Sequence, residues 1–169
     1  MTLDGLGLPA RTLEQLELRS LVDRLAEEPD LWRHHVAFRQ DKRHFVSLHR
    51  DEYLDVWLIC WGPLDDTGWH DHDISCGAVR VAQGSLNESR LRLGGRHAVS
   101  LVQSGRSFSF GPEHIHRLSG VDSSAVSIHA YSPPLWRLGQ YSISDAGVMR
   151  RLSVSYAEEL RPLDPVTAA

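Results

Sequence analysis

Two histidines separated by one residue, in the segment Trp69-His70-Asp71-His72-Asp73, have the residue type and the spacing of metal ligands. Side chains alternate between the two faces of an extended strand, so this spacing directs both imidazoles to the same side. Imidazole is a common ligand, but the chain has ten histidines, and such a pair can also lie exposed at the end of a strand. His70 and His72 therefore provide half of a possible metal site.

A second pair of alternating histidines, His114 and His116, follows an aromatic segment and a Gly-Pro pair further along the chain. One histidine of this pair, together with His70 and His72, would complete three ligands on one face and leave positions open for substrate. Three imidazoles carry no charge, so the ion keeps its full positive charge and binds an anion such as a thiolate strongly. Strand alternation alone would let either His114 or His116 face the site.

A third segment, Ser127-Ile128-His129-Ala130-Tyr131, alternates polar and apolar residues, so Ser127, His129 and Tyr131 share one face of a predicted strand. The serine hydroxyl can bond one ring nitrogen of His129, and the other nitrogen can orient the tyrosine hydroxyl as a proton donor or acceptor near a metal. The same alternation would also suit a strand whose polar face is exposed to solvent. The segment is thus a candidate hydrogen-bonded relay.

These segments need a framework, and the length and the 41% hydrophobic content predict one domain over residues 1–169. Residues 11–38 are predicted to form a helical cap, residues 43–156 a set of β-strands, and residues 157–169 a peripheral tail. Short strands with regular turn signals are typical of a sandwich or barrel, and a small barrel can hold one ligand or metal among inward-facing side chains.

Within the cap, leucines at intervals of three to five residues predict an amphipathic helix over residues 11–28, with Thr12 and Gln15 as its capping box. A second short helix is predicted from Leu31 to about Phe38. The runs predicted as strands are Val56–Ile59, Gly77–Ala82, Ala98–Val102, Ser107–Phe110, Ala125–Tyr131, Tyr141–Ile143 and Val148–Val154, with turns at Gly94-Gly95 and Asp145-Ala146-Gly147.

Composition argues against several classes of protein. The net charge is −4 and the basic residues form no stripe, which argues against nucleic-acid binding. No apolar run approaches the roughly 20 residues of a membrane span, and the first residues do not resemble a signal peptide. Cys60 and Cys76 are too few for a disulfide framework, so free thiols and a cytoplasmic location are expected.

Taken together, the three segments resemble the cysteine dioxygenase family of cupins. The stretch from Ile59-Cys60-Trp61-Gly62 through His70-Asp71-His72 to Val81–Glu88 is similar to the first metal motif of that family. His116-Arg117-Leu118 is similar to the second motif. Ser127 to Pro134 is similar to the family's Ser-x-His-x-Tyr-Ser-Pro-Pro segment. The resemblance extends from about residue 12 to residue 155.

This resemblance implies a mainly β fold, a cupin-type antiparallel β-barrel (a double-stranded β-helix or jelly roll) with a small N-terminal helical cap. It implies that His70, His72 and His116 bind Fe(II) and that Ser127, His129 and Tyr131 form the catalytic relay beside the metal. The implied reaction adds both atoms of O2 to the sulfur of a small thiol such as cysteine and gives a sulfinate. A monomer is the implied oligomeric state.

The sequence departs from the family at two positions. The general cupin motif would place a carboxylate ligand at Gly77, and some cysteine dioxygenases have there a cysteine cross-linked to the tyrosine. We therefore expect three histidine ligands and no Cys–Tyr cross-link, because strand alternation directs the neighbouring Cys76 away from the site.

The second departure concerns the arginine that binds the substrate carboxylate in cysteine-specific members. Ungapped counting from Trp61 reaches His44, so Arg43 and Arg50 both remain candidates, and a one-residue shift would change the strand face. Arg43 and Trp61 are the predicted substrate-binding residues, although Trp61 would suit core packing equally well. Cysteine, 3-mercaptopropionate and cysteamine all remain possible substrates. The histidines expected only at the surface or in packing are His34, His35, His44, His49 and His97.

Two alternatives to a thiol dioxygenase remain open from the sequence. One is another cupin metalloenzyme that acts on a non-thiol substrate, since ligand type alone does not select the metal. The other is a non-catalytic sensor of metal or small molecules, in which the relay residues would be dispensable.

Overall fold

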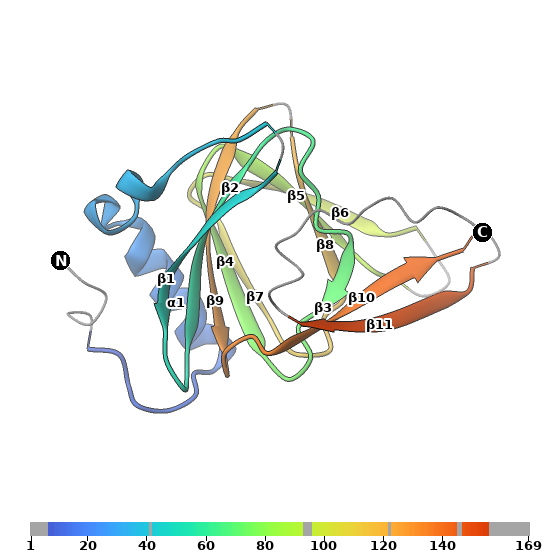
Figure 1. Ribbon diagram of the computed structural model, residues 1–169, viewed down its shortest axis with the longest axis horizontal. Helices are drawn as coiled ribbons and strands as arrows, with labels where there is room; N and C mark the ends of the chain where they lie inside the picture. Colours follow the sequence, from blue (N-terminus) through green and yellow to red (C-terminus); the bar gives the residue numbers. More distant parts are fainter. Residues whose placement is uncertain (1–6, 41, 93–95, 122, 145–146, 156–169) are drawn as a thin grey trace.

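The computed structural model describes residues 7–40, 42–92, 96–121, 123–144 and 147–155, which fold into two facing antiparallel sheets with a helix against the outer side of one of them (Figure 1). The strands pair within two sheets rather than around one closed barrel. The predicted mainly β, jelly-roll fold class is therefore confirmed, with the two sheets as its layers. The single domain over residues 1–169 stays a prediction, and the tail over residues 157–169 lies outside the described residues.

The helical cap contains one α-helix, α1 (Gln15–Ala26). Its buried side chains are spaced three or four residues apart and lie on one face: Leu18, Leu21, Val22 and Leu25. The predicted capping box of Thr12 and Gln15 is wrong, because the box is formed by Glu14 and Glu17, whose carboxylate accepts a hydrogen bond from the Glu14 backbone N–H at 2.9 Å.

The predicted second helix is also absent, and two single 3₁₀ turns, η2 (Pro29–Leu31) and η3 (Arg33–His35), occupy its place. The Trp32 indole N–H donates to the Leu25 carbonyl at 3.1 Å. This bond holds the two 3₁₀ turns against the C-terminal end of α1.

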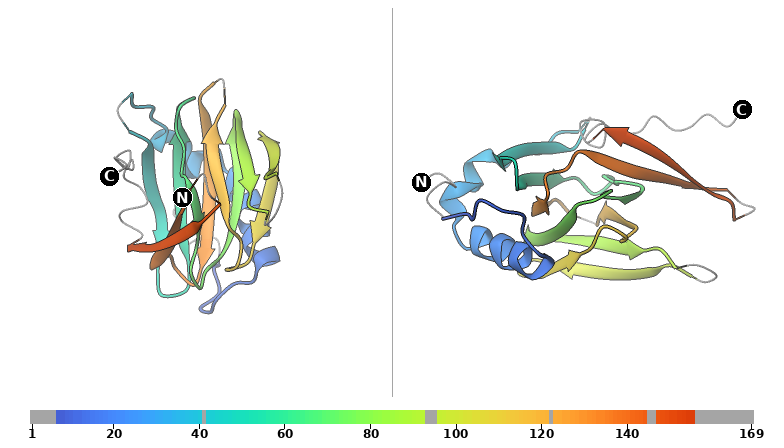
Figure 2. Two further views of the ribbon diagram at one scale, coloured as in Figure 1. Left: turned by 90° about the vertical axis from the view of Figure 1, so that its right-hand side faces the viewer. Right: turned by 90° about the horizontal axis from the view of Figure 1, so that it is seen from below.

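The five-stranded sheet lies beside α1. Its strands, in spatial order, are β1 (His44–Arg50), β2 (Asp55–Trp61), β9 (Ala125–Ser132), β4 (Cys76–Gln83) and β7 (Ser107–Phe110). The six-stranded sheet faces it, in the order β11 (Met149–Ser155), β10 (Arg137–Ile143), β3 (Trp69–Asp71), β8 (His116–Gly120), β5 (Ser85–Arg90) and β6 (Ala98–Gln103). Figures 1 and 2 show β10 and β11 extending as an arm away from α1.

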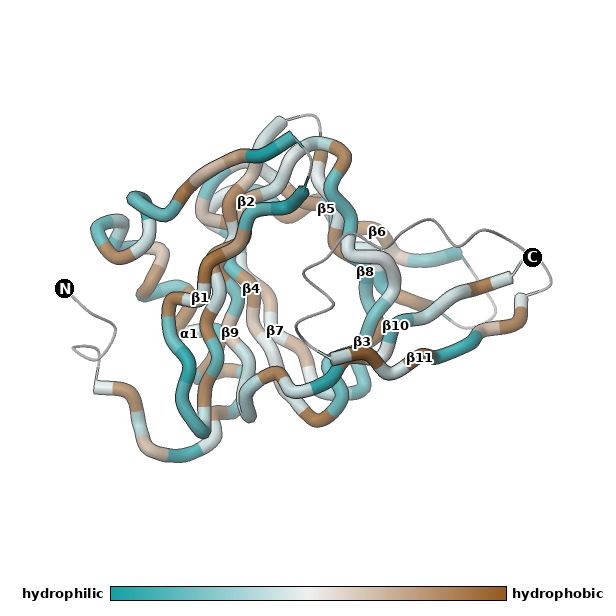
Figure 3. The backbone as a smooth tube through the Cα atoms, viewed as in Figure 1, coloured by the Kyte–Doolittle hydropathy of each residue, from teal (hydrophilic) through white to brown (hydrophobic). Residues whose placement is uncertain are grey.

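The central strands β2 and β9 are buried on both faces, which explains why β2 is an almost continuous apolar run, whereas β9 alternates apolar residues with the polar residues of the site. Figure 3 shows hydrophobic residues along β2 and along the neighbouring α1. Even-numbered residues such as Leu58 and Ile128 pack against α1, whereas odd-numbered residues such as Ile59 and Val79 pack between the sheets. The inner face of this sheet therefore presents the odd-numbered residues of β9, among them Ser127, His129 and Tyr131.

All the predicted strand runs coincide with strands of the structure. Strands β5 and β6 form a hairpin, as do β10 and β11, but the predicted turn residues 94–95 and 145–146 lie outside the described residues. Cys60 and Cys76 are free thiols, as expected. Among the helices described, none has the length and apolar character needed to cross a membrane.

Candidate metal centre

Three imidazoles of the six-stranded sheet meet between the two sheets. His70 on β3 lies directly opposite His116 on β8, and His72 follows immediately after β3 on the same face as His70. One ring nitrogen from each of the three lies within 4.8 Å of the others, and all three side chains are buried. These are distances over which a single ion could be shared by three nitrogen ligands.

The hydrogen bonds of these rings leave the correct atoms for a metal. His70 Nδ1 donates to the Gly68 carbonyl at 3.1 Å and His116 Nδ1 donates to the Glu88 carboxylate at 3.2 Å, so each Nε2 carries the lone pair. His116 Nε2 and both ring nitrogens of His72 are buried and make no hydrogen bond to any described residue. Buried polar atoms that lack partners and point toward one place fit a bound cation.

Electrostatics favour the neutral form of two of these rings, His72 and His116. Burial lowers the pKa of His72 well below its usual value, and the neighbouring His70 and His116 lower it further. Burial also lowers the pKa of His116 to about 3, although its hydrogen bond to Glu88 opposes the change. A metal ligand must offer a lone pair, so rings that stay neutral at neutral pH are ready to bind an ion.

Glu88 is a functional candidate that the sequence did not single out. Its buried carboxylate on β5 accepts hydrogen bonds from His114 Nε2 at 3.0 Å and from His116. Burial would raise the pKa of Glu88, but these hydrogen bonds outweigh burial and lower it to about 2. The signal was present as alternation, because Glu88 shares the inward face of β5 with the buried Leu86, whereas Asn87 is only half-buried.

His114 itself lies at the edge of the site. It is part of a second group, with Glu88 and His116, whose ligand atoms are close enough to hold an ion, but its hydrogen bond to Glu88 occupies Nε2. The histidines expected only at the surface or in packing belong to neither group of described residues: His34, His35, His44, His49 and His97.

The structure brings the three relay candidates together on β9, on the inner face of the five-stranded sheet. Ser127 Oγ lies 2.7 Å from His129 Nε2, and His129 Nδ1 lies 3.0 Å from the Tyr131 hydroxyl. The Tyr131 ring stacks on His72 with 5.2 Å between ring centroids. The two sheets thus place a hydrogen-bonded tyrosine against one of the three clustered imidazoles.

Gly77 and Phe110 complete the wall beside Tyr131. A Cβ atom at Gly77 would overlap with the Phe110 ring and lie 3.1 Å from Tyr131 Cδ1, so the ring occupies the space that a larger residue would need. Phe110 also packs on His72, with 4.5 Å between ring centroids. Cys76 packs in the cluster on the α1 side of the sheet, the face that strand alternation predicts, and the absence of a cross-link stays a prediction.

The two arginine candidates lie in different surroundings. The pairing of β1 with β2 sets His44 opposite Cys60, so Arg43 lies opposite Trp61. The buried Arg43 guanidinium lies over the Trp61 ring, 4.8 Å from its centroid. Arg50 instead pairs with Asp55 and donates to the Leu135 carbonyl at 3.0 Å, so its charge serves the packing of the strands.

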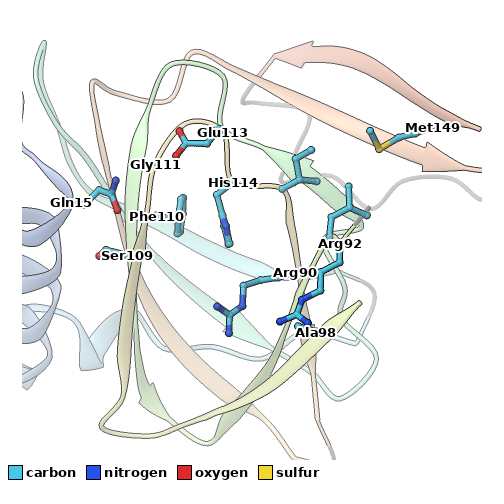
Figure 4. A pocket seen from close by; sticks show the side chains of 12 residues that line it. Gln15, Arg90, Arg92, Ala98, Ser109, Phe110, Gly111, Glu113, His114 and Met149 are labelled. Carbon is cyan, nitrogen blue, oxygen red and sulfur yellow. The ribbon is translucent and has the colours of Figure 1, made fainter. Parts of the chain in front are cut away.

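An open cleft of about 640 Å³ lies beside the cluster, between β7 and the β5–β6 hairpin (Figure 4). Phe110 and His114 line it, and each ring also lies 4.8 Å from the ring of His116. Arg90 lines the cleft as well, with its guanidinium 3.6 Å from the Glu88 carboxylate.

The chain is similar to known proteins in sequence and in fold. The sequence profile of the family described as "Cysteine dioxygenase type I" matches residues 10–144. The chain belongs to this family. The match includes the three clustered histidines and all three residues of the β9 relay, so the resemblance drawn from the motifs is confirmed at the level of the family.

Curated members of the cysteine dioxygenase family show modest similarity. Human cysteine dioxygenase type 1 is 23% identical over 131 residues, which cover 70% of this chain and 64% of the human protein. The zebrafish protein of the same name is 26% identical over 131 residues and is covered to 65%. The chain thus spans slightly less than two thirds of the length of these relatives.

Solved structures agree on the fold alone. An uncharacterized conserved protein with a double-stranded β-helix domain from Klebsiella pneumoniae has a TM-score of 0.52 at 11% identity, over 70% of this chain and 91% of that one. The protein TT1209 from Thermus thermophilus has a TM-score of 0.51 at 17% identity, over 60% of this chain and 92% of that one.

Proposed function

We propose that this member of the cysteine dioxygenase type I family is an Fe(II)-dependent dioxygenase that oxidises a small thiol to its sulfinate. The observation that carries the proposal is the meeting of three buried, inward-facing imidazoles from one sheet with a tyrosine held from the other sheet. In the reaction, RSH and O2 give RSO2H. Both oxygen atoms join the sulfur, which supplies all the electrons, so no external reductant is needed.

His70, His72 and His116 would hold the ion, which when bound would supply Lewis-acid and redox chemistry beside the sulfur. The three ligands bring no negative charge, so the site favours the thiolate form of a substrate over the thiol. Glu88 and the Gly68 carbonyl orient two of the rings through their Nδ1 atoms. The surrounding Phe110 and Trp61 exclude water from the space between the sheets.

Tyr131, His129 and Ser127 would position a proton at the edge of this space. The Tyr131 hydroxyl is held by His129 Nδ1 at 3.0 Å, and His129 is held by Ser127 at 2.7 Å. A hydroxyl fixed at one location can donate a hydrogen bond to the reacting sulfur or oxygen atoms without first having to be ordered.

Arg43 would bind the substrate carboxylate. It is a buried cation that directly precedes β1 and lies over the Trp61 ring, and its planar guanidinium suits a carboxylate better than an ammonium group would. The proposal therefore favours cysteine or 3-mercaptopropionate, which carry a carboxylate, over cysteamine, which carries none.

The test is oxygen consumption by the Fe(II)-loaded protein with cysteine, 3-mercaptopropionate and cysteamine, with mass spectrometry of the products. We expect one carboxylate-bearing thiol to gain two oxygen atoms and the Arg43→Ala variant to raise its KM. Turnover of a non-thiol substrate would favour another cupin metalloenzyme. Binding of metal with no turnover of any thiol would favour a sensor. The cytoplasmic location and the monomeric state expected from the sequence stay predictions.

A further inference from the structure

We propose that Trp61 is a positioning residue that sets the direction of the hydrogen bonds in the Ser127–His129–Tyr131 relay, and thereby makes His129 the donor and the Tyr131 oxygen the acceptor of the bond between them. The inference rests on the proposed function, in which the tyrosine donates a hydrogen bond during thiol oxidation. It starts from a contact outside the three relay residues. The Trp61 indole Nε1 lies 2.8 Å from Ser127 Oγ, and both side chains are fully buried.

The chemistry of the indole determines the first bond. Indole N–H can only donate, so Ser127 Oγ must accept from Trp61. The hydroxyl has one proton, and within the described part of the chain its other hydrogen-bonded contact is His129 Nε2, at 2.7 Å. If His129 Nε2 also donated to Ser127, the buried hydroxyl proton would have no acceptor, which is costly in a side chain without access to water.

The second bond follows from the first. Ser127 donates to His129 Nε2, so this nitrogen carries the lone pair, and the proton of the neutral ring is on Nδ1. His129 Nδ1 therefore donates to the Tyr131 oxygen across 3.0 Å. The tyrosine oxygen accepts this bond, so His129 does not take the tyrosine proton. If the hydrogen bonds ran in the opposite direction, the Tyr131 hydroxyl would donate its proton to His129 Nδ1.

The surroundings of His129 support a neutral ring. The Trp61 ring stacks beside the His129 ring, with 6.2 Å between centroids and 25° between the planes, and the Arg43 guanidinium lies over Trp61. Burial lowers the pKa of His129 well below its usual value, and His116 and the Arg43 cation contribute to the change. A charged imidazolium would donate from both nitrogens and remove the direction that Trp61 imposes.

The direct test reads the tautomer of His129 by nuclear magnetic resonance. Correlation of ring ¹⁵N nuclei with ring protons distinguishes Nδ1–H from Nε2–H, and protein loaded with Zn(II) is diamagnetic. We expect the Nδ1–H tautomer in the wild type, with the signal assigned by its loss in His129→Gln. In Trp61→Phe the two orientations of Ser127 become closer in energy, so the Nε2–H tautomer should become visible. A wild-type ring in the Nε2–H form would overturn the proposal.

Trp32→Phe provides a matched control, since it removes another buried indole N–H, bonded to the Leu25 carbonyl on the far side of the five-stranded sheet. We expect it to lower the melting temperature and leave the His129 tautomer unchanged. If Trp61→Phe does not fold, Ser127→Ala interrupts the same chain of hydrogen bonds with a smaller change in volume and should release the same tautomer. An unchanged tautomer in both site variants would count against the proposal.

Kinetics of the Fe(II)-loaded protein then test whether Trp61 acts through Ser127. Trp61→Phe and Ser127→Ala should each lower kcat by roughly tenfold, the rate equivalent of one neutral hydrogen bond, with a smaller change in KM. The double variant should be no slower than Ser127→Ala alone. Multiplied effects would show that Trp61 acts independently of the relay and would overturn the proposal. The tautomer is measured without turnover. An inactive protein would therefore contradict the proposed function, whereas the spectra would still test this inference.

Discussion

At the scale of single residues, the orientation of His116 depends on a carboxylate that is distant in sequence. Glu88 accepts from His116 Nδ1 and His114 Nε2 while almost wholly buried, at 4% exposure. A carboxylate behind an imidazole fixes its tautomer and raises its basicity as a ligand. Glu88 should therefore influence metal binding without touching the metal.

We predict that Glu88→Gln weakens Fe(II) binding by about 10- to 100-fold, because the neutral amide holds His116 Nδ1 less strongly. Isothermal titration of the metal-free protein with Fe(II) under anaerobic conditions measures this. Glu113→Gln is the matched control, since Glu113 is an exposed carboxylate on the loop before β8, and it should bind as the wild type does. Equal affinities for the two variants would contradict the role of Glu88.

We predict that Tyr131→Phe lowers kcat by about 100-fold or more, as expected for loss of a positioned proton donor. Its affinity for Fe(II) should stay close to that of the wild type, since the aromatic ring that stacks on His72 is retained. Oxygen uptake and metal titration on the same preparation separate the two effects. A variant that retains full activity would favour the sensor hypothesis over the relay.

At the scale of elements, the pairing of β4 with β9 and β7 decides what can lie beside the tyrosine. Gly77 is opposite Tyr131 on one side and opposite Phe110 on the other. The absence of a side chain at Gly77 lets the Phe110 ring fill the space between β4 and the metal cluster. The residue type at position 77 on β4 and the position of the Phe110 ring on β7 are therefore coupled.

We predict that Gly77→Ala destabilises the protein by about 1–3 kcal/mol, because its Cβ would overlap with the buried Phe110 ring. Urea unfolding followed by circular dichroism measures the loss. Phe110→Leu should recover part of it in the double variant, since the smaller side chain vacates the contested space. Purely additive losses would mean that the two residues do not compete.

The two thiols provide a further test of strand orientation. Burial raises the pKa of both Cys60 and Cys76, so each forms less thiolate than a free cysteine at the same pH. We predict that both thiols are alkylated slowly in the native protein, and that the rate rises only at a pH above that at which a free cysteine reacts. Alkylation in urea should be rapid. Mass spectrometry of alkylated peptides identifies each site. Fast native labelling of Cys60 would contradict its burial in the hydrophobic cluster on the α1 side of the sheet.

At the scale of the whole molecule, the site is shared between the two sheets. The six-stranded sheet contributes the three imidazoles, and the five-stranded sheet contributes Tyr131 and Phe110, which pack on His72. A ligand that binds only the folded arrangement stabilises it by RT ln(1 + [L]/Kd). Metal binding should therefore stabilise the association of the layers as well as the site itself.

We predict that metal at 100 times its Kd stabilises the fold by about 2.7 kcal/mol and raises the melting temperature by several degrees. A chelator should reverse the rise. Differential scanning calorimetry with and without Zn(II) measures it, and His72→Ala, which removes a ligand candidate with no hydrogen bond to a described residue, should abolish the metal-dependent part. A wild-type melting temperature that does not change when metal is added would contradict the proposed metal site.

Periodicity and residue type were sufficient for the broad outline. The apolar runs predicted their strands because the central strands are buried on both faces, and the alternation in Ser127-Ile128-His129-Ala130-Tyr131 predicted which residues share a face. Helix ends were less predictable. Both Thr12 and Glu14 precede the helix at plausible positions, and the choice of Glu14 depends on where Glu17 can reach.

The sequence by itself determined the two-residue spacing of the histidines and of the relay, because alternation along a strand is a local property of the backbone. Only the tertiary structure decided the rest. The register of β3 on β8 sets His70 opposite His116, the pairing of β1 with β2 brings Arg43 over Trp61, and the packing of β5 hides Glu88 behind His116. The strands β3 and β8, and likewise β5 and β8, are far apart in the chain, and β1 and β2 pair across a bulge, so no local spacing specifies how these strands align.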